Sequence, residues 1–154
     1  MEHYYTENPN TPHSLGKIDY TIHNVKLEFM TDTGVFSKNH IDFGSDVLIK
    51  NLPATSGKVL DLGCGYGPIG IAIAKLNPSV SVTMVDINNR AIDLANQNII
   101  KNGITNAKAI QSDGFDAISS CKYDVIISNP PIRAGKKIIY GLFEESFEHL
   151  IEGG

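Results

Sequence analysis

The sequence predicts an α/β fold in which a doubly wound, mostly parallel sheet is preceded by a β-hairpin and a helix. Three observations predict it. From residue 59 onward, short apolar runs alternate with helical segments, which is the pattern of βαβ units. The first apolar run ends in a glycine-rich turn, and Pro68 then begins a helix. Within residues 17–30, polar and apolar residues alternate with the period of antiparallel strands.

The N-terminal third of the chain divides into an arm, a hairpin and a helix. Residues 1–16 are rich in Asn, Pro, Ser and Gly and predict an extended arm or loop. Two short alternations within 17–30 meet at His23-Asn24, which predicts a β-hairpin. Apolar residues then recur at helical spacing before a proline, so a helix is expected over 42–51.

The rest of the chain repeats strand and helix in turn. Parallel strands joined by helical crossovers form a sheet covered on both faces. The expected strands are 59–62, 80–85, 107–111 and 123–128, and the expected helices are 69–76, 90–101 and 136–151.

The last predicted helix meets a glycine stop signal at residue 153, where a further strand would normally begin. A sheet of these strands alone would leave one edge without a partner. We therefore expect further C-terminal strands beyond Gly154 in the natural protein. The stretch 1–154 is expected to be a single domain with an arm (1–16), a hairpin and helix (17–53) and a core (54–154).

Composition excludes several classes of protein. With 13 Lys and Arg against 17 Asp and Glu, a net charge of −4 excludes a protein that coats nucleic acid by bulk electrostatics, but not a local basic patch. No apolar run approaches the roughly 18 to 20 residues that cross a bilayer, and the start has no signal-peptide pattern, so a cytoplasmic protein is expected. The two cysteines, Cys64 and Cys121, form no CxxC pair and the histidines are scattered, so no disulfide and no metal site is expected.

The strongest local signal is the glycine-rich turn after the first parallel strand, and two interpretations of it compete. The stretch 65–70 matches GxGxxG, and Asp86 follows Gly65 by 21 residues, as in a dinucleotide site. A GxGxG turn that begins at Gly63 is the other register, and it follows Asp61, a carboxylate in an otherwise apolar strand. Such a carboxylate can hold loop N–H groups or a ligand amino group, which the dinucleotide pattern does not require.

The register that begins at Gly63 resembles the cofactor-binding segment of class I S-adenosylmethionine-dependent methyltransferases, which are Rossmann-like and carry an acidic residue before GxGxG. The resemblance implies S-adenosyl-L-methionine as the cofactor. It implies that Asp86 binds both ribose hydroxyls and that Ile87 contacts adenine. It also implies that the methionine part of the cofactor is contacted by the loop residues Asp61, Gly63, Cys64, Gly65 and Gly67. The adenine amino group is implied to contact the pair Asp113 and Gly114.

Several of these residues also have a plainer interpretation. Asp86 is compatible with an N-cap of the helix that follows, and Asp113 with a turn former before Gly114. Cys64 is expected to be a small packing residue, because methyl transfer needs no thiol nucleophile.

A second signal is Asn129-Pro130-Pro131-Ile132, directly after the last strand. A residue before proline is extended and proline has no N–H, so this turn is rich in hydrogen-bond acceptors. The Asn129 side-chain oxygen and the Pro130 carbonyl can each accept one hydrogen of a substrate NH₂ group, which directs its lone pair at an electrophile. The alternative is that the turn merely ends a strand.

The same turn resembles the Asn-Pro-Pro-aromatic signature of methyltransferases that act on planar amino groups. Ile132 departs from it, because an aromatic residue usually stands there and stacks on the target. Phe36 is the candidate for a substitute face. Asn129, Pro130, Pro131 and Ile132 are expected to form the catalytic set, with Asn129 and Phe36 also beside the cofactor.

The stretches 34–37, 42–45 and 129–136 resemble the small-subunit ribosomal RNA guanine-N2 methyltransferase family, particularly its short single-domain members. That resemblance implies that Phe36, Ser37, Asp42 and Gly44 help cover the cofactor, and that the partner is ribosomal RNA or the small ribosomal subunit.

One basic cluster follows the catalytic turn. Arg133, Lys136 and Lys137 are expected to hold phosphates beside a flipped-out base. The alternative is a solvated helix start, although Lys is unfavourable at a helix N-terminus.

The sequence thus predicts an S-adenosylmethionine-dependent N-methyltransferase acting on an exocyclic amino group of RNA, with guanine N2 of small-subunit ribosomal RNA as the expected target. The alternatives are a protein-glutamine or adenine N6 methyltransferase, an NAD-linked oxidoreductase and a non-catalytic RNA-binding module.

Overall fold

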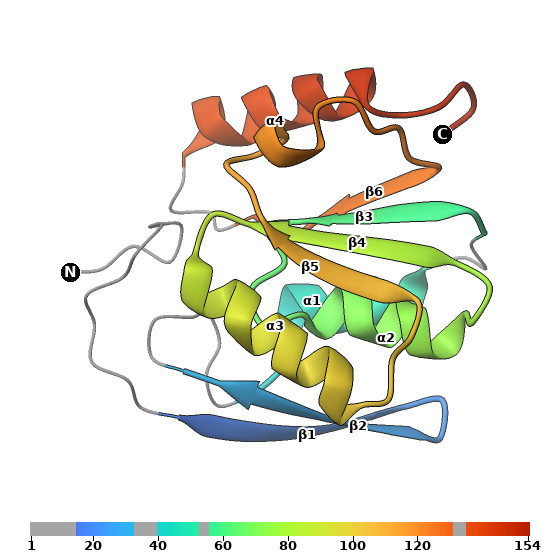
Figure 1. Ribbon diagram of the computed structural model, residues 1–154, viewed down its shortest axis with the longest axis vertical. Coiled ribbons are helices and arrows are strands. Elements are labelled where there is room, and N and C mark those ends of the chain that lie inside the picture. Colours follow the sequence, from blue (N-terminus) through green and yellow to red (C-terminus); the bar gives the residue numbers. More distant parts are fainter. Residues whose placement is uncertain (1–14, 33–39, 53–55, 131–134) are drawn as a thin grey trace.

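The sheet at the centre of the protein confirms the predicted fold class. The computed structural model describes residues 15–32, 40–52, 56–130 and 135–154. Its four-stranded sheet is parallel throughout, with the order β5-β4-β3-β6 (Figure 1). The strands are β3 (Lys58–Leu62), β4 (Ser81–Asp86), β5 (Ala107–Gln111) and β6 (Val125–Ser128).

Helices cover both faces of this sheet. Three lie on one face, and α4 (Lys136–Glu148) lies on the other together with the short 3₁₀ helix η1 (Asp116–Ile118) (Figure 1). The three are α1 (Phe43–Asn51), α2 (Pro68–Leu76) and α3 (Asn89–Lys101). Because the order reverses between β3 and β6, the chain leaves these two adjacent strands toward opposite faces, and ligands bind at such a switch point in open α/β sheets.

The predicted hairpin is confirmed and forms a separate layer beneath the helices (Figure 1). It consists of β1 (Gly16–Ile22) and β2 (Val25–Thr31). Both residues of its turn have positive φ, 47° at His23 and 64° at Asn24, as a two-residue hairpin with a type I′ turn requires. The inward side chains of β2, Leu27 and Phe29, are buried against the helical layer.

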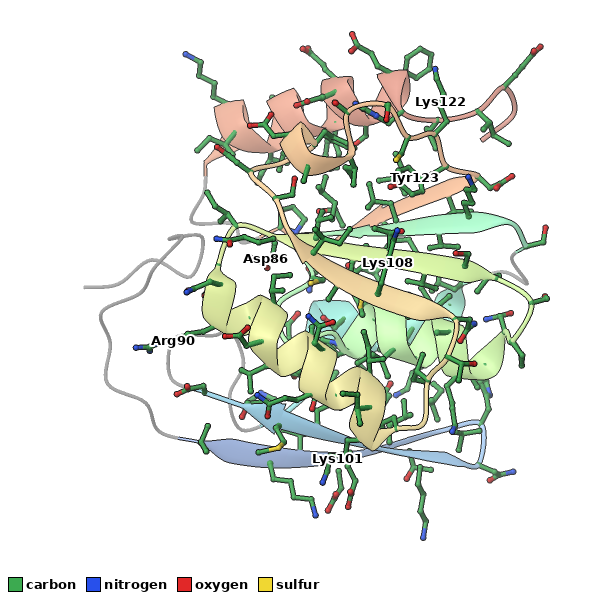
Figure 2. The ribbon with its side chains drawn as sticks, in the orientation of Figure 1. Asp86, Arg90, Lys101, Lys108, Lys122 and Tyr123 are labelled. Carbon is green, nitrogen blue, oxygen red and sulfur yellow. The ribbon has the colours of Figure 1, made fainter. Side chains whose placement is uncertain are left out.

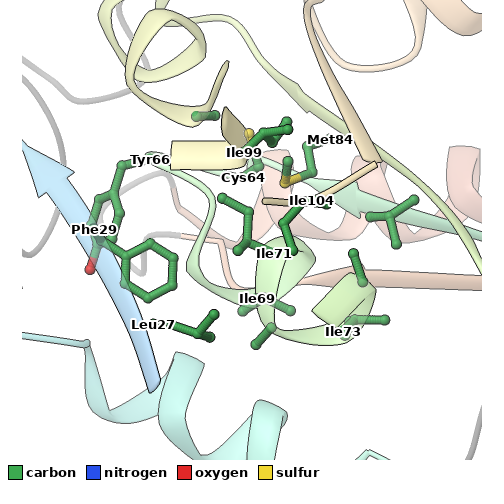
Figure 3. Close-up of a cluster of buried hydrophobic side chains, with 14 of the residues drawn as sticks. Leu27, Phe29, Cys64, Tyr66, Ile69, Ile71, Ile73, Met84, Ile99 and Ile104 are labelled. Atoms are coloured by element: carbon green, nitrogen blue, oxygen red, sulfur yellow. The ribbon is translucent and has the colours of Figure 1, made fainter. Parts of the chain in front are cut away.

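The main hydrophobic core fills the space between the hairpin, α2, α3 and the sheet (Figure 3). It extends to the glycine-rich turn, because the Tyr66 ring packs tilted against Phe29 with their centroids 5.8 Å apart. A smaller cluster, which includes Phe115 and Tyr123, lies on the α4 side of the sheet. The hairpin therefore supports the turn from below.

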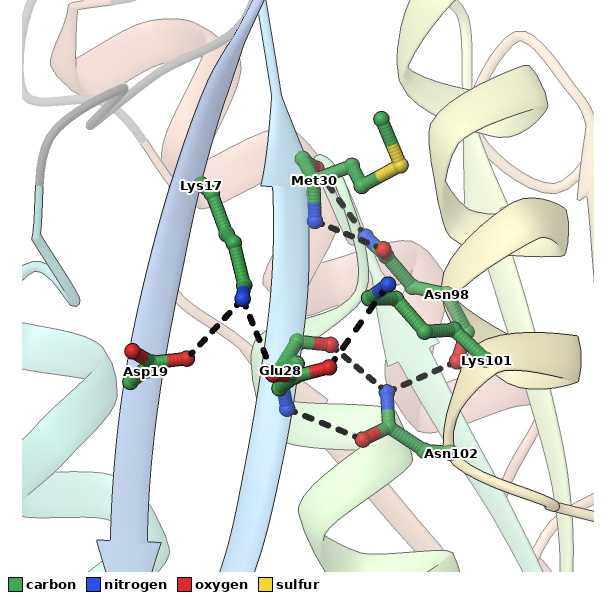
Figure 4. A network of polar contacts seen from close by, with 7 residues as sticks. All are labelled: Lys17, Asp19, Glu28, Met30, Asn98, Lys101 and Asn102. Atoms are coloured by element: carbon green, nitrogen blue, oxygen red, sulfur yellow. Dashed lines mark hydrogen bonds and ion pairs between the residues drawn. The ribbon is translucent and has the colours of Figure 1, made fainter.

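Asn98 on α3 and Asn102, the C-cap residue of that helix, hold the outer edge of β2 (Figure 4). The Asn98 amide accepts from the Met30 N–H (2.7 Å) and donates to the Met30 carbonyl (3.1 Å) and the Tyr66 carbonyl (2.9 Å). One turn later, Asn102 accepts from the Glu28 N–H (3.0 Å) and donates to the Glu28 carbonyl (2.8 Å). These side chains replace the neighbouring strand that an edge otherwise lacks.

Substitution of the buried Asn98 by alanine is expected to lower the free energy of unfolding by about 2 to 5 kcal/mol, because it removes two bonds to the Met30 backbone and leaves the buried Tyr66 carbonyl without this partner. Asn102→Ala is the matched control, with a smaller expected loss because Asn102 is partly exposed and water can replace its bonds. Urea unfolding of both variants measures this. Equal losses would contradict the role given to Asn98.

The structure corrects two predicted boundaries near the C-terminus. The strand expected over 123–128 begins at Val125, and the helix expected over 136–151 ends at Glu148. Tyr123 instead forms an isolated parallel bridge with Leu150: its N–H donates to the His149 carbonyl (2.8 Å) and its carbonyl accepts from the Ile151 N–H (3.0 Å). This long-range pairing competes with continuation of the helix, and local periodicity does not reveal it.

Candidate active site

A cavity of about 480 Å³ opens at the carboxyl edge of the sheet. Residues that follow β3, β4, β5 and β6 line it, together with the start of α1 and one side of α4. Its size and its mixture of apolar walls with a few polar groups are typical of a cofactor site.

The glycine-rich turn forms the floor of the cavity. The N–H groups of Gly63 and Cys64 both donate to the Val85 carbonyl at 2.9 Å, and the Gly65 N–H donates to Asp86 Oδ2 at 2.8 Å. Gly63 has a φ of +73°, and a Cβ there would meet nothing within 4 Å. These bonds hold the turn against β4, and a ligand can approach the backbone at Gly63.

Neither Asp61, which lies beneath this turn, nor Gly67, which ends it, lines the cavity. The Asp61 carboxylate accepts from the Gly70 N–H at 3.0 Å, and burial raises its pKa from 3.8 to about 7, with a further contribution from the charge of Asp86. Gly67 precedes α2 with a φ of +100°, and a Cβ there would lie 2.9 Å from Ile71 Cδ1. Both residues position the turn.

Asp86 lies at the carboxyl end of β4 and lines the cavity (Figure 2). Besides the Gly65 N–H, it accepts from the Asn88 N–H at 2.9 Å. Burial raises the pKa of its carboxyl group, and these backbone N–H groups oppose that shift. The interpretation of Asp86 as an N-cap is wrong, because Asn88 caps α3 with bonds from the Arg90 and Ala91 N–H groups.

The turn after β5 forms another wall. Asp113 and Gly114 of this turn line the cavity, and so does Ile87, which directly follows β4. Ser112 shapes this turn, because its hydroxyl donates to the Gly114 carbonyl (2.7 Å) and accepts from the Ala117 N–H (3.0 Å). Asp113 remains exposed at the rim.

Asn129 lies beside the glycine-rich turn. Leu62 and Ser128 are register partners in β3 and β6, and the Ser128 hydroxyl donates to the Leu62 carbonyl at 3.0 Å. The next residues, Gly63 and Asn129, therefore leave the sheet side by side, and Pro130 follows along the cavity wall. Two segments far apart in the sequence therefore meet at one cavity.

The Asn129 amide nitrogen has partners on α1. It donates to Asp42 Oδ2 at 2.6 Å and to Ser45 Oγ at 3.1 Å. Asp42 is also the N-cap of α1, since the same oxygen accepts from the Ser45 N–H at 3.2 Å. The capping pattern is visible in the sequence, but its contact with a residue 87 positions away is not.

The other predicted site residues are distributed as follows. Cys64 lines the cavity, and burial raises the pKa of its thiol well above the ordinary value, which agrees with a packing role. Lys136 and Lys137 begin α4, exposed and outside the cavity lining. The other predicted residues lie outside the described part of the chain: Phe36, Ser37, Pro131, Ile132 and Arg133.

Sequence reasoning missed the wall formed by α4, where Ile138, Leu142 and Glu145 face the cavity. Their spacing is helical but carries no signal for a ligand. Within the described residues, no group of three or more His, Cys, Asp or Glu side chains could hold a metal ion. None of the described helices is long and apolar enough to cross a membrane.

Comparisons with known proteins agree with this architecture. A family model described as the methyltransferase small domain matches residues 26–154. The uncharacterized protein YbxB of Bacillus subtilis is 44% identical over 99% of this chain and 78% of that protein. Ribosomal RNA small subunit methyltransferase C of Aeromonas hydrophila is 41% identical, over 77% of this chain but 34% of that protein.

Among solved structures, the 16S rRNA N2 G1207 methyltransferase (RsmC) of T. thermophilus, in complex with AdoMet and guanosine, has a TM-score of 0.79 at 22% identity. The alignment covers 93% of this chain and 41% of that one, so the two share the fold. From the family match over residues 26–154 and the identity to YbxB over nearly the whole chain, it follows that the protein belongs to the methyltransferase small domain family.

Proposed function

We propose that this protein transfers the methyl group of S-adenosylmethionine to an exocyclic amino nitrogen of RNA, namely guanine N2 of small-subunit ribosomal RNA. The observation that carries the proposal is the position of Asn129 and Pro130 beside the glycine-rich turn, at one cavity. In that cavity, the turn proposed to bind the cofactor lies next to two hydrogen-bond acceptors, the Asn129 side-chain oxygen and the Pro130 carbonyl.

The cavity fits the cofactor at each of its parts. The open side of Gly63 suits the methionine portion, and Asp86 offers lone pairs to ribose hydroxyls. Asp113 and Ile87 also line the cavity and would offer adenine one polar and one apolar contact. When bound, S-adenosylmethionine supplies an electrophilic methyl group on a sulfonium leaving group, so the protein needs only to position the acceptor.

The acceptor chemistry depends on Asn129 and Pro130. An exocyclic amino group on a ring is a weak nucleophile, because its lone pair is delocalised. Two acceptors that hold both N–H hydrogens favour the tetrahedral nitrogen that forms during attack, and this interaction is stronger in the transition state than in the ground state. The side-chain oxygen of Asn129 is one of these acceptors, while its amide nitrogen donates to Asp42 and Ser45 at the start of α1.

The choice of RNA rests on similarity. Ribosomal RNA small subunit methyltransferase C of Aeromonas hydrophila is a relative that carries a functional name, and the chain covers 34% of it. Lys136 and Lys137 lie at the start of α4, after the catalytic turn, and would hold flanking phosphates of a flipped-out base. The NAD interpretation loses its support because the family model that matches residues 26–154 is a methyltransferase domain.

Methyl transfer from labelled S-adenosylmethionine tests the proposal. The acceptors are small ribosomal subunits without the modification, free ribosomal RNA and a peptide release factor, and the products are identified by mass spectrometry. N2-methylguanosine is expected. Label on a glutamine or on adenine N6 would overturn the guanine assignment, and cofactor binding without any transfer would favour an RNA-binding module.

Substitution of Asp86 by asparagine is expected to weaken S-adenosylmethionine binding by about 10- to 100-fold, because hydrogen bonds to a charged acceptor are worth about 1.5 to 3 kcal/mol. Isothermal titration calorimetry measures this. Asp93→Asn is the matched control, since Asp93 is an exposed carboxylate on α3 outside the cavity lining. Equal affinities of the two variants would rule out the ribose contact.

A further inference from the structure

We propose that Asp42 and Ser45 are positioning residues that set the orientation of the Asn129 side-chain amide, so that its oxygen faces the substrate amino group. This inference rests on the proposed function. It concerns a side chain whose two ends are nearly isosteric and have opposite hydrogen-bonding roles. Without a partner that distinguishes the oxygen from the nitrogen, the amide can rotate by about 180° and direct its N–H groups at the substrate N–H groups.

The carboxylate of Asp42 distinguishes the nitrogen of the Asn129 amide from its oxygen. An ionised carboxylate only accepts, so the group 2.6 Å from Asp42 Oδ2 must be the amide nitrogen of Asn129. The hydroxyl of Ser45, 3.1 Å from the same nitrogen, accepts the second amide hydrogen. With both hydrogens bound, the nitrogen has none left for a ligand, and the oxygen keeps its lone pairs.

The start of α1 is built for this contact. A Cβ on Gly44 would lie 2.8 Å from the Asn129 side-chain oxygen and 3.0 Å from its nitrogen, so glycine lets the helix approach. Asp42 is itself held by the Ser45 N–H, and the positive end of the helix stabilises its negative charge. Both Asp42 and Ser45 line the cavity along with Asn129.

The amide orientation is tested first without any reaction. In ¹⁵N spectra of the full chain, the Asn129 side-chain signal is identified by its absence in Asn129→Ala. Asp42→Asn is expected to shift this signal and to speed its hydrogen exchange, while asparagine still caps α1. Asp46→Asn is the matched control in the same helical turn, because Asp46 binds Tyr20 and Lys50 and makes no bond to Asn129.

Activity then supplies a rescue test. Asn129→Asp places two carboxylates against each other and is expected to lower kcat by about 100-fold or more. Combination with Asp42→Asn is expected to restore kcat about tenfold or more over Asn129→Asp, because residue 42 can then donate to one carboxylate oxygen while the other accepts from the substrate.

The outcomes separate this inference from the function on which it rests. An unchanged Asn129 signal in Asp42→Asn, or no rescue in the double variant, would overturn the positioning role even if the wild type methylates RNA. The expected spectral shifts together with a wild type that methylates no exocyclic amino group would leave the amide geometry standing and remove the proposed function.

Discussion

Replacement of Asn129 by alanine is expected to lower kcat for methyl transfer by about 100- to 1,000-fold, the range found when one hydrogen-bonding group that acts in the transition state is removed. The variant loses the side-chain oxygen that accepts from the substrate amino group, whereas the Pro130 carbonyl remains. Single-turnover transfer to small ribosomal subunits measures this effect. The affinity for S-adenosylmethionine is expected to change by less than about threefold, because the Gly63–Gly67 turn is intact.

Asn96→Ala is the matched control for this variant. Asn96 is exposed on α3, and its only hydrogen bond among those described is a donation to the Ala109 carbonyl at 3.3 Å. Its kcat is expected to equal that of the wild type. A rise in KM at constant kcat in Asn129→Ala would assign Asn129 to ground-state binding and exclude the transition-state role.

Replacement of Asp61 by asparagine is expected to stabilise the protein increasingly as the pH rises. Burial raises the pKa of Asp61 from 3.8 to about 7, so between these values the folded state binds a proton that the unfolded state has lost. The Asp61 contribution to the free energy of unfolding therefore falls by about 1.4 kcal/mol per pH unit across this window. The Asp61→Asn variant has no carboxyl group to titrate at this position, and its amide oxygen can still accept from the Gly70 N–H.

Urea unfolding of the wild type and Asp61→Asn at intervals from pH 4 to pH 8 measures the difference. The two proteins are expected to converge near pH 4 and to differ by as much as about 4 kcal/mol at pH 8. Asp93→Asn, which removes an exposed carboxylate, is expected to show no such divergence. A constant difference between Asp61→Asn and the wild type would show that the Asp61 carboxyl does not titrate in this window.

Much of the fold follows from local patterns. The period-2 alternation and the His23-Asn24 turn predict the hairpin, because both residues tolerate the positive φ that the turn requires. The glycine-rich turn and the Asn-Pro-Pro turn were also recognisable, since each depends on backbone properties of its own residues. The end of α4 was not recognisable from the sequence, because the pairing between Tyr123 and Leu150 decides where this helix ends.

The amino-acid order alone was enough to predict the hairpin, the parallel strands, the α-helices and the two turns that carry the site signals, because periodicity, glycine and proline act locally. What the side chains at the carboxyl edge of the sheet do became visible only in the folded chain. Asp61 is buried beneath the turn and not in the cavity, and Asn129 binds Asp42 across 87 residues of sequence. Burial and contact between distant segments arise from packing, and packing is a property of the whole folded chain.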